Sequence, residues 1–199
     1  MSRTRKYAAF LLAASFAGCA ARGHVATPDE LARLGEAQGL SASGRLTLSG
    51  PRGRFSTRVV FGVARLDSLR LEVPSGTGLR FLLIARDGAL RADLPGDDAM
   101  FEGPGTKEVM AGLFGIEISP KELVNAILGS PPSAMDVAFR FEKALPAEVR
   151  IRGEGGTLLA LNLSDPEVAA PRPQAFAFGA PRDHVLSLVA MSERLGLTR

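Results

Sequence analysis

Residues 43–63, SGRLTLSGPRGRFSTRVVFGV, contain the pattern that decides the fold. Leu46 and Leu48 alternate with polar residues, and the alternation resumes at Phe55 and Phe61 after a Gly-Pro-Arg-Gly turn. A period of two is typical of strands that bury one face and expose the other. The stretch therefore predicts two antiparallel strands joined by a turn.

Further runs of the same period follow along the chain and predict a mainly β domain. They lie at residues 69–73, 90–94, 137–141, 149–151 and 159–163, and residues 79–84 add a more fully apolar strand. Asp87-Gly88 is a typical hairpin turn between two of them, and Phe176 with Phe178 indicates one more short strand. Strands that are consecutive in sequence usually pair, so the simplest topology is an antiparallel meander with one apolar face.

Four helices are expected beside these strands. Thr27-Pro28-Asp29-Glu30 and Ser119-Pro120-Lys121-Glu122 are capping boxes with proline at the first helical position. The first box predicts a short amphipathic helix that stops at Gly39. Thr106 is a candidate cap for a third helix, and residues 183–195 predict a C-terminal helix.

The N-terminus has the features of an export signal. Arg3, Arg5 and Lys6 precede an apolar run at residues 8–17, which leads into Phe16-Ala17-Gly18-Cys19. The run is too short for a membrane-spanning helix, which needs about 20 apolar residues. Its last four residues resemble the lipobox of bacterial lipoproteins, in which the cysteine is acylated. A lone free thiol beside an ordinary cleavage site is the alternative.

This signal sets the expected domain organisation. Residues 1–18 would be removed, residues 19–26 would form a lipidated, palmitate-bearing N-terminus and tether, and residues 27–199 would form a single domain. Cys19 is the only cysteine, so no internal disulfide can form. Ala20 follows it, whereas an aspartate there would favour the inner membrane by the best-known sorting rule. We therefore expect a lipid-anchored outer-membrane protein that faces the periplasm.

Composition argues against several functional classes. The signal contains three of the 24 basic residues and none of the 21 acidic ones, so the processed chain is near neutral and lacks a basic nucleic-acid footprint. The chain has eleven Phe, no Trp and one Tyr, which is Tyr7 in the signal. Carbohydrate sites and nucleic-acid stacking platforms usually use Trp or Tyr, so an apolar interior is the favoured interpretation.

Three segments resemble the LolA/LolB superfamily, and within it the LolB-like outer-membrane lipoprotein receptors. They are Gly44-Arg45-Leu46, LRLEVPSG at residues 69–76, and LFGIEI at residues 113–118 followed by Leu128-Gly129. The resemblance implies an α+β, mainly β fold, namely an incomplete, strongly curved antiparallel β-barrel covered by lid helices. The tail after Asp165 has no counterpart in the family, which indicates a diverged member.

The resemblance also implies an apolar cavity that holds the acyl chains of lipoproteins. The candidate lining residues are all apolar and lie on the expected inner face of a strand or on a lid helix. They are Leu46, Leu48, Phe55, Val59, Phe61, Leu71, Val73, Phe81, Met110, Phe114, Leu123, Ile127, Phe139, Phe141 and Leu161. The loop after the third strand would deliver cargo to the membrane, and its candidates are Ser75 and Leu79.

The expected function is protein transport by a chaperone-like, lipid-binding monomer. It would take acylated lipoproteins from a LolA-like periplasmic carrier for insertion into the outer membrane, with specificity for the chain and not the head group. One alternative is an envelope assembly or interaction lipoprotein that uses the same fold with a filled core. A periplasmic hydrolase is another.

Residues suited to catalysis or metal binding are few. His24 and His184 have no metal-ligand spacing, and no G-x-S-x-G elbow accompanies them. The segment Gly103-Pro104-Gly105-Thr106-Lys107 lacks phosphate-loop spacing and predicts only a capped helix start. Asp93 and the Asp97-Asp98 pair are expected to be solvated turn residues. We predict no metal site, no cofactor and no enzymatic activity.

Overall fold

The computed structural model describes residues 23–50, 53–153 and 156–196. The expected signal peptide and Cys19 lie outside the described residues. Within those residues, eleven strands form a single sheet. The strands are β1 His24–Val25, β2 Gly39–Gly50, β3 Gly53–Ala64, β4 Ser68–Ser75, β5 Gly78–Arg86, β6 Ala89–Leu94, β7 Ala99–Pro104, β8 Asp136–Glu142, β9 Leu145–Arg152, β10 Leu158–Glu167 and β11 His184–Val185.

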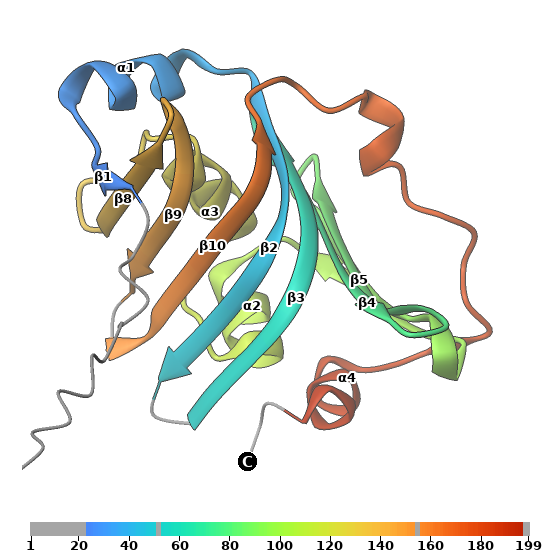
Figure 1. Ribbon diagram of the computed structural model, residues 1–199. Coiled ribbons are helices and arrows are strands. Elements are labelled where there is room, and N and C mark those ends of the chain that lie inside the picture. The colour runs from blue at the N-terminus through green and yellow to red at the C-terminus, as the bar shows by residue number, and fades with distance from the viewer. Residues whose placement is uncertain (1–22, 51–52, 154–155, 197–199) are drawn as a thin grey trace, which may run out of the picture.

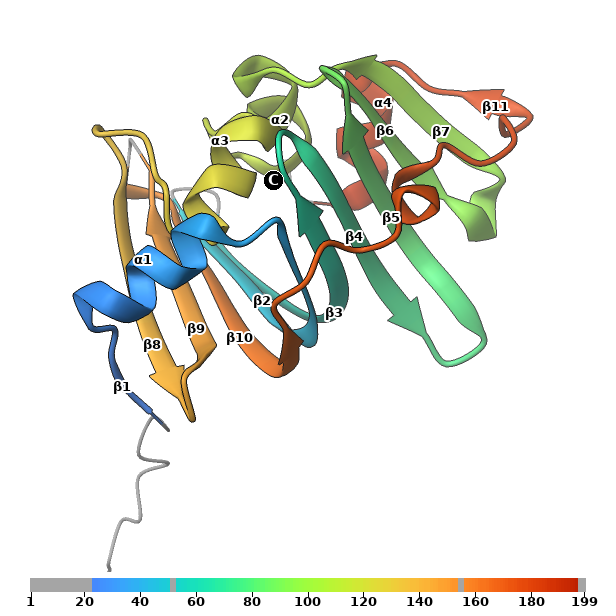
Figure 2. The ribbon, with the colours of Figure 1, turned by 90° about the horizontal axis from the view of Figure 1, so that it is seen from above.

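The sheet is strongly curved and does not close into a barrel (Figure 2). Its strand order is β1-β8-β9-β10-β2-β3-β4-β5-β6-β7-β11, and all neighbours are antiparallel except β7 and β11, which are parallel. Strands β2 to β7 form the predicted meander. The predicted fold class, an incomplete curved barrel with covering helices, is confirmed.

Four α-helices and the short 3₁₀ helices η1 and η3 accompany the sheet in the described part of the chain. They are α1 Pro28–Glu36, α2 Lys107–Phe114, α3 Pro120–Ile127, α4 Leu188–Leu195, η1 Pro95–Asp97 and η3 Pro173–Phe176. Helices α2 and α3 lie inside the curve of the sheet (Figures 1 and 2). We call the face toward them the concave face and the opposite face the convex face.

The register of β2 and β3 explains the apolar concave face. Leu48 pairs with Phe55 and Ala42 pairs with Phe61, so that alternate residues of both strands point to the same side. The neighbouring strands continue this row, since Phe61 pairs in turn with Leu71. The main hydrophobic core therefore lies between the concave face and the helices.

Gly44 permits a close approach of two strands within the curve. A Cβ atom at this position would lie 2.1 Å from the carbonyl oxygen of Asn162 on β10. A glycine inside a strand commonly marks such an approach or a bend. The Gly44-Arg45-Leu46 segment therefore has a structural reason for its glycine.

Both capping boxes are present. The Thr27 and Ser119 hydroxyls accept hydrogen bonds from the backbone N–H of Glu30 and Glu122, and each glutamate accepts one in return from the backbone N–H of the cap. The predicted stop of the first helix at Gly39 is wrong, because the helix ends at Glu36. Gly39 instead begins β2, where a Cβ atom would lie 2.6 Å from the Val63 carbonyl oxygen.

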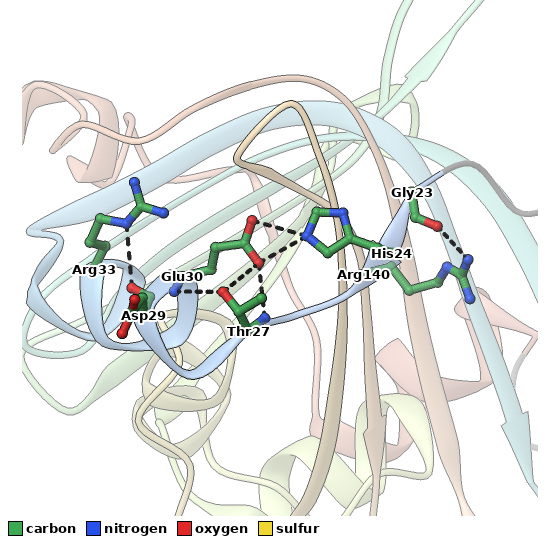
Figure 3. Close-up of polar contacts among 7 residues, drawn as sticks. All are labelled: Gly23, His24, Thr27, Asp29, Glu30, Arg33 and Arg140. Atoms are coloured by element: carbon green, nitrogen blue, oxygen red, sulfur yellow. Dashed lines mark hydrogen bonds and ion pairs between the residues drawn. The ribbon is translucent and has the colours of Figure 1, made fainter.

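Part of the expected tether joins the fold (Figure 3). His24 and Val25 pair with β8, and the Arg140 guanidinium donates to the Gly23 carbonyl over 2.7 Å. His24 Nε2 lies 3.0 Å from Glu30 Oε2, in the first turn of α1. The hydrogen bond from the Thr27 backbone N–H lowers the pKa of Glu30 despite its burial, and the bond with His24 adds to the effect.

The C-terminal region differs from the prediction in two places. Phe176 ends the 3₁₀ helix η3 and is 3% exposed, while Phe178 is exposed, so they form no strand. The predicted helix at residues 183–195 begins only at Leu188, because His184 and Val185 first pair with β7. Residues 168–183, which we call the strap, run along the outside of the sheet (Figure 2).

Arginine side chains hold the strap on the convex face. Arg91 donates to the Gly179 and Ala180 carbonyls over 2.9 and 2.6 Å, and Arg70 donates to the Ala175 carbonyl over 2.8 Å. Arg91 Nε also lies 2.8 Å from Asp93 Oδ1, and these two side chains are only 3% and 4% exposed. The expectation that Asp93 is solvated is wrong, because the strap covers it.

Candidate functional site

An apolar cavity lies between the concave face and helices α2 and α3. We call it the inner cavity, and its volume is about 50 Å³. Its lining consists only of apolar side chains. They are Leu46, Leu48, Phe61, Leu69, Leu71, Leu83, Met110, Phe114, Ile116, Leu123, Ile127, Leu159 and Leu161.

A second cavity of about 80 Å³, the mouth cavity, adjoins the first on the side of α4. Its lining is apolar except for two arginines. The residues are Leu46, Leu48, Phe55, Leu71, Val73, Arg80, Phe81, Leu94, Phe114, Arg194 and Leu195. Phe114 borders both cavities. Its ring packs edge to face against the ring of Phe81, and the ring centroids are 5.9 Å apart.

The structure brings together most of the residues proposed from the sequence. Twelve of the fifteen candidates line one or both cavities. The other three, Val59, Phe139 and Phe141, are buried in the core and line neither cavity. Whether any of the fifteen contacts a ligand stays a prediction.

Several lining residues were missed by the sequence analysis. Leu69, Leu83 and Leu159 lie on the same strand faces as the predicted residues, so the period of two was a signal that could have found them. Arg80 and Arg194 gave no such signal. Both are polar. The position of Arg80 depends on an irregularity in β5, and that of Arg194 depends on the path of the C-terminal segment.

The two inner helices are fixed to each other at their N-termini. Thr106 caps α2, and Lys107 Nζ in its first turn lies 2.9 Å from Glu122 Oε1 in α3. Burial alone would raise the pKa of Glu122, but the hydrogen bonds from Lys107 and Ser119 outweigh it and hold that pKa below its ordinary value. The carboxylate therefore links the two helices while it is ionised.

Helix α4 closes the mouth cavity by packing on α2. Met191 is completely buried, and a Cβ atom at Gly112 of α2 would lie only 2.8 Å from Leu188 Cδ2. At the last turn, Arg194 Nη1 lies 2.9 Å from Asp97 Oδ2, and both side chains are half exposed. Apolar packing and one exposed ion pair thus hold this helix in place.

A polar hollow of about 580 Å³ adjoins the mouth cavity. Arg80, Leu94 and Arg194 line both. Ser75 and Leu79, the candidates for membrane delivery, also line the hollow. The β4–β5 hairpin therefore lies beside the opening to the apolar cavities.

The polar candidates have structural partners or lie apart from the cavities. His24 bonds Glu30, His184 begins β11, and Lys107 bonds Glu122. Among the residues that the structure describes, no group of three His, Cys, Asp or Glu side chains is arranged to hold a metal ion. Of the helices in this part of the chain, none is long and apolar enough to cross a membrane.

No family model matches the sequence, and a search of curated proteins gave no match. Among solved structures, an uncharacterised conserved protein from Thermus thermophilus is 8% identical, with a TM-score of 0.40 over 79% of this chain and 94% of that chain. A domain named for outer membrane lipoprotein sorting, from Vibrio parahaemolyticus, is 10% identical, with a TM-score of 0.40 over 74% and 93%. A DUF1329 family protein from Desulfovibrio piger is 7% identical, with a TM-score of 0.38 over 74% and 94%. These values assign neither a family nor a function to this chain.

Proposed function

We propose that this protein binds acyl chains between the concave face of its sheet and the helices that cover it. The observation that carries the proposal is the lining of the inner cavity, where all thirteen side chains are apolar. Such a cavity offers water no hydrogen-bond partner, while each buried methylene contributes about 0.8 kcal/mol. Binding needs no covalent step, so the proposal is a lipid-handling protein without enzymatic activity.

We also propose a place for this activity in the cell envelope. The lipobox-like segment at Cys19 supports a lipid anchor, and the LolB-like sequence segments support a receptor that faces the periplasm at the outer membrane. In that role the protein would accept an acylated lipoprotein from a LolA-like carrier. The β4–β5 hairpin beside the mouth cavity, with Ser75 and Leu79, would deliver it to the membrane.

The size of the cavities sets a condition on binding. An apolar cavity of roughly 150 Å³ holds one benzene molecule, and the two cavities here measure about 50 and 80 Å³. A longer chain therefore requires Phe114 to turn or α4 to move. Phe114 borders both cavities from the helix side, opposite Leu46, Leu48 and Leu71 of the sheet, so its movement would join them.

A binding experiment with a blocked variant tests the proposal. The full chain carrying Cys19→Ala, which cannot be acylated, is titrated with dodecanol by calorimetry and native mass spectrometry. We expect one bound molecule, and at least tenfold weaker binding when Leu71→Trp fills the junction of the two cavities. Val60→Trp is the control, since Val60 lies on the neighbouring strand, points to the convex face and is 46% exposed.

Transfer of an acylated lipoprotein from a loaded carrier to this chain, and loss of transfer in Leu71→Trp, would support the receptor role. Absence of dodecanol binding by the unblocked chain would overturn acyl-chain binding itself. Binding without transfer would overturn only the receptor role.

The small cavity volumes favour one second candidate, an envelope interaction module with a filled core. Val25 on β1, Val185 on β11 and Val189 on α4 are 75%, 68% and 66% exposed and offer apolar contact at the two edges of the sheet. A chain that binds no dodecanol but forms a stable complex with another envelope protein through these residues would establish this alternative.

A further inference from the structure

We propose that Arg80 and Arg194, which line both the mouth cavity and the polar hollow, bind the anionic head group of an amphiphile whose acyl chain lies in the apolar cavities. This inference rests on the proposed function and names the class of its ligand. Arg80 and Arg194 are the two polar residues in the lining of the mouth cavity, and the other nine are apolar. An apolar space whose lining includes two arginines matches a molecule with an apolar tail and a negative head.

A bulge in β5 directs Arg80 toward the mouth cavity. Val73 pairs with Phe81 and the next residue of β4, Pro74, pairs with Leu79, so Arg80 has no partner residue on β4. Regular alternation would point position 80 to the face opposite Phe81, whereas a bulge turns a side chain out of that alternation and is common beside functional sites. The Arg80 side chain forms no ion pair or hydrogen bond with any residue that the structure describes.

Arg194 provides the second positive charge from the last turn of α4. Its Nη1 atom bonds Asp97, which leaves other guanidinium N–H groups for a ligand because the group carries five donors. Asp97 is the carboxylate that lines the same hollow, so the three groups together have a net positive charge. An anionic head would compete with Asp97 for Arg194 and meet Arg80 without competition.

The polar hollow has the space that the head group needs. It measures about 580 Å³ and shares Arg80, Leu94 and Arg194 with the mouth cavity. A head group there keeps part of its hydration while the chain leaves water, which is the arrangement of lowest cost for an amphiphile. The sequence alone predicted specificity for the acyl chain and not for the head group, because no sequence pattern placed either arginine at the cavity.

The test compares three ligands that share one chain and differ in the head. Dodecanoate, dodecyl phosphate and neutral dodecanol are titrated into the full chain carrying Cys19→Ala. We expect the two anions to bind about tenfold more tightly than the alcohol, since charge-assisted hydrogen bonds are about twice as strong as neutral ones. The difference should shrink at about 0.5 M salt, because half-exposed charges are screened.

Variants assign the effect to the two arginines. Arg80→Gln and Arg194→Gln should each reduce the anion preference, taken as the ratio of anion to dodecanol affinity for the same variant, to about threefold, and the double variant should abolish it. Asp97→Asn should increase the preference, since it removes the competing carboxylate. Arg58→Gln, an exposed position on the convex face of β3, is the control and should change nothing.

The possible results separate this inference from the function on which it rests. Equal affinities for anions and alcohol, or a full preference retained in Arg80→Gln, would overturn the head-group site and leave acyl-chain binding intact. Failure of all three ligands to bind would overturn both. A preference for only one of the two anions would support the site and identify its head group as carboxylate or phosphate.

Discussion

The two faces of the sheet are covered in different ways. On the concave face, α2, α3 and α4 pack through apolar side chains and leave cavities of about 50 and 80 Å³. On the convex face, the strap is held by hydrogen bonds from Arg70 and Arg91 to its backbone carbonyls. Apolar contacts have no fixed direction and can be exchanged for other apolar partners, whereas a buried hydrogen bond is costly to leave unmade. Under the proposed function, the helices are therefore the cover that a ligand would displace, and the strap would stay in place.

Asp93→Asn tests the fixed cover and should have the largest effect. The variant keeps the shape of the side chain but leaves the buried Arg91 guanidinium without its carboxylate. Removal of one partner of a buried ion pair costs about 3–5 kcal/mol, so the free energy of unfolding in urea should fall by about this amount. Arg91→Met combined with Asp93→Leu leaves no charge unpaired, so it should cost less and lose mainly the two hydrogen bonds from Arg91 to the strap.

The control for Asp93→Asn is Asp136→Asn. Asp136 lies 4.0 Å from Arg152, and these side chains are 72% and 68% exposed. An exposed pair contributes about 1 kcal/mol or less to stability. The free energy of unfolding of the control should therefore be close to that of the native protein. Similar losses in the two variants would mean that the strap is not held by its buried ion pair.

Sequence reasoning found the concave face because that face is made by local patterns. The alternation of Leu46 and Leu48 predicted strand β2, and the capping box at Ser119 predicted helix α3. Each of these signals spans only a few residues of the sequence. Twelve of the fifteen proposed lining residues follow from the same alternation and helix spacing. The volume left between these side chains could not be derived, because it depends on how they pack.

The convex face was not predictable in this way because its cover comes from a distant segment. Alternation correctly places Arg91 and Asp93 on the polar side of β6, but only the path of the strap buries them. The same holds for Arg194, which reaches the cavity because the chain passes around the edge of the sheet at β11. Arg80 depends on a bulge that no residue pattern announces.

Leu83→Ala and Ile84→Ala compare the two covers at neighbouring positions of β5. Leu83 lines the inner cavity and Ile84 points to the convex face, and their side chains are 2% and 1% exposed. Each substitution should lower the free energy of unfolding by about 2–5 kcal/mol. Only Leu83→Ala should also bind dodecanol more tightly, because it enlarges the apolar cavity on the ligand side.

Calorimetric titration of both variants under conditions where they remain folded checks this second prediction. Near-ultraviolet circular dichroism can verify the fold beforehand. An equal gain of affinity in Ile84→Ala would show that the ligand responds to general loosening and not to space on the concave face. An unchanged affinity in Leu83→Ala would separate the inner cavity from the binding site.

The ends of the helices over the concave face are the polar exception in this cover, and they should have the smallest effect. Hydrogen bonds from Lys107 and Ser119 hold the pKa of Glu122 below its ordinary value of 4.5. A carboxyl with a lowered folded-state pKa contributes stability above its unfolded pKa and loses it as the pH falls through the folded value. The native protein should therefore lose stability as the pH falls from about 5 towards 3.

Glu122→Gln should remove this part of the acid dependence. At neutral pH the variant should be about 1 kcal/mol less stable, as for the loss of a helix cap, and the difference should close at low pH. Urea unfolding across this range measures it, with Glu117→Gln as the control because Glu117 is exposed in the same loop. A difference that stays constant with pH would show that the ionised carboxylate contributes nothing to these helix ends. Apolar contacts alone would then hold α2 and α3, and the contrast with the arginine-held strap would be sharper still.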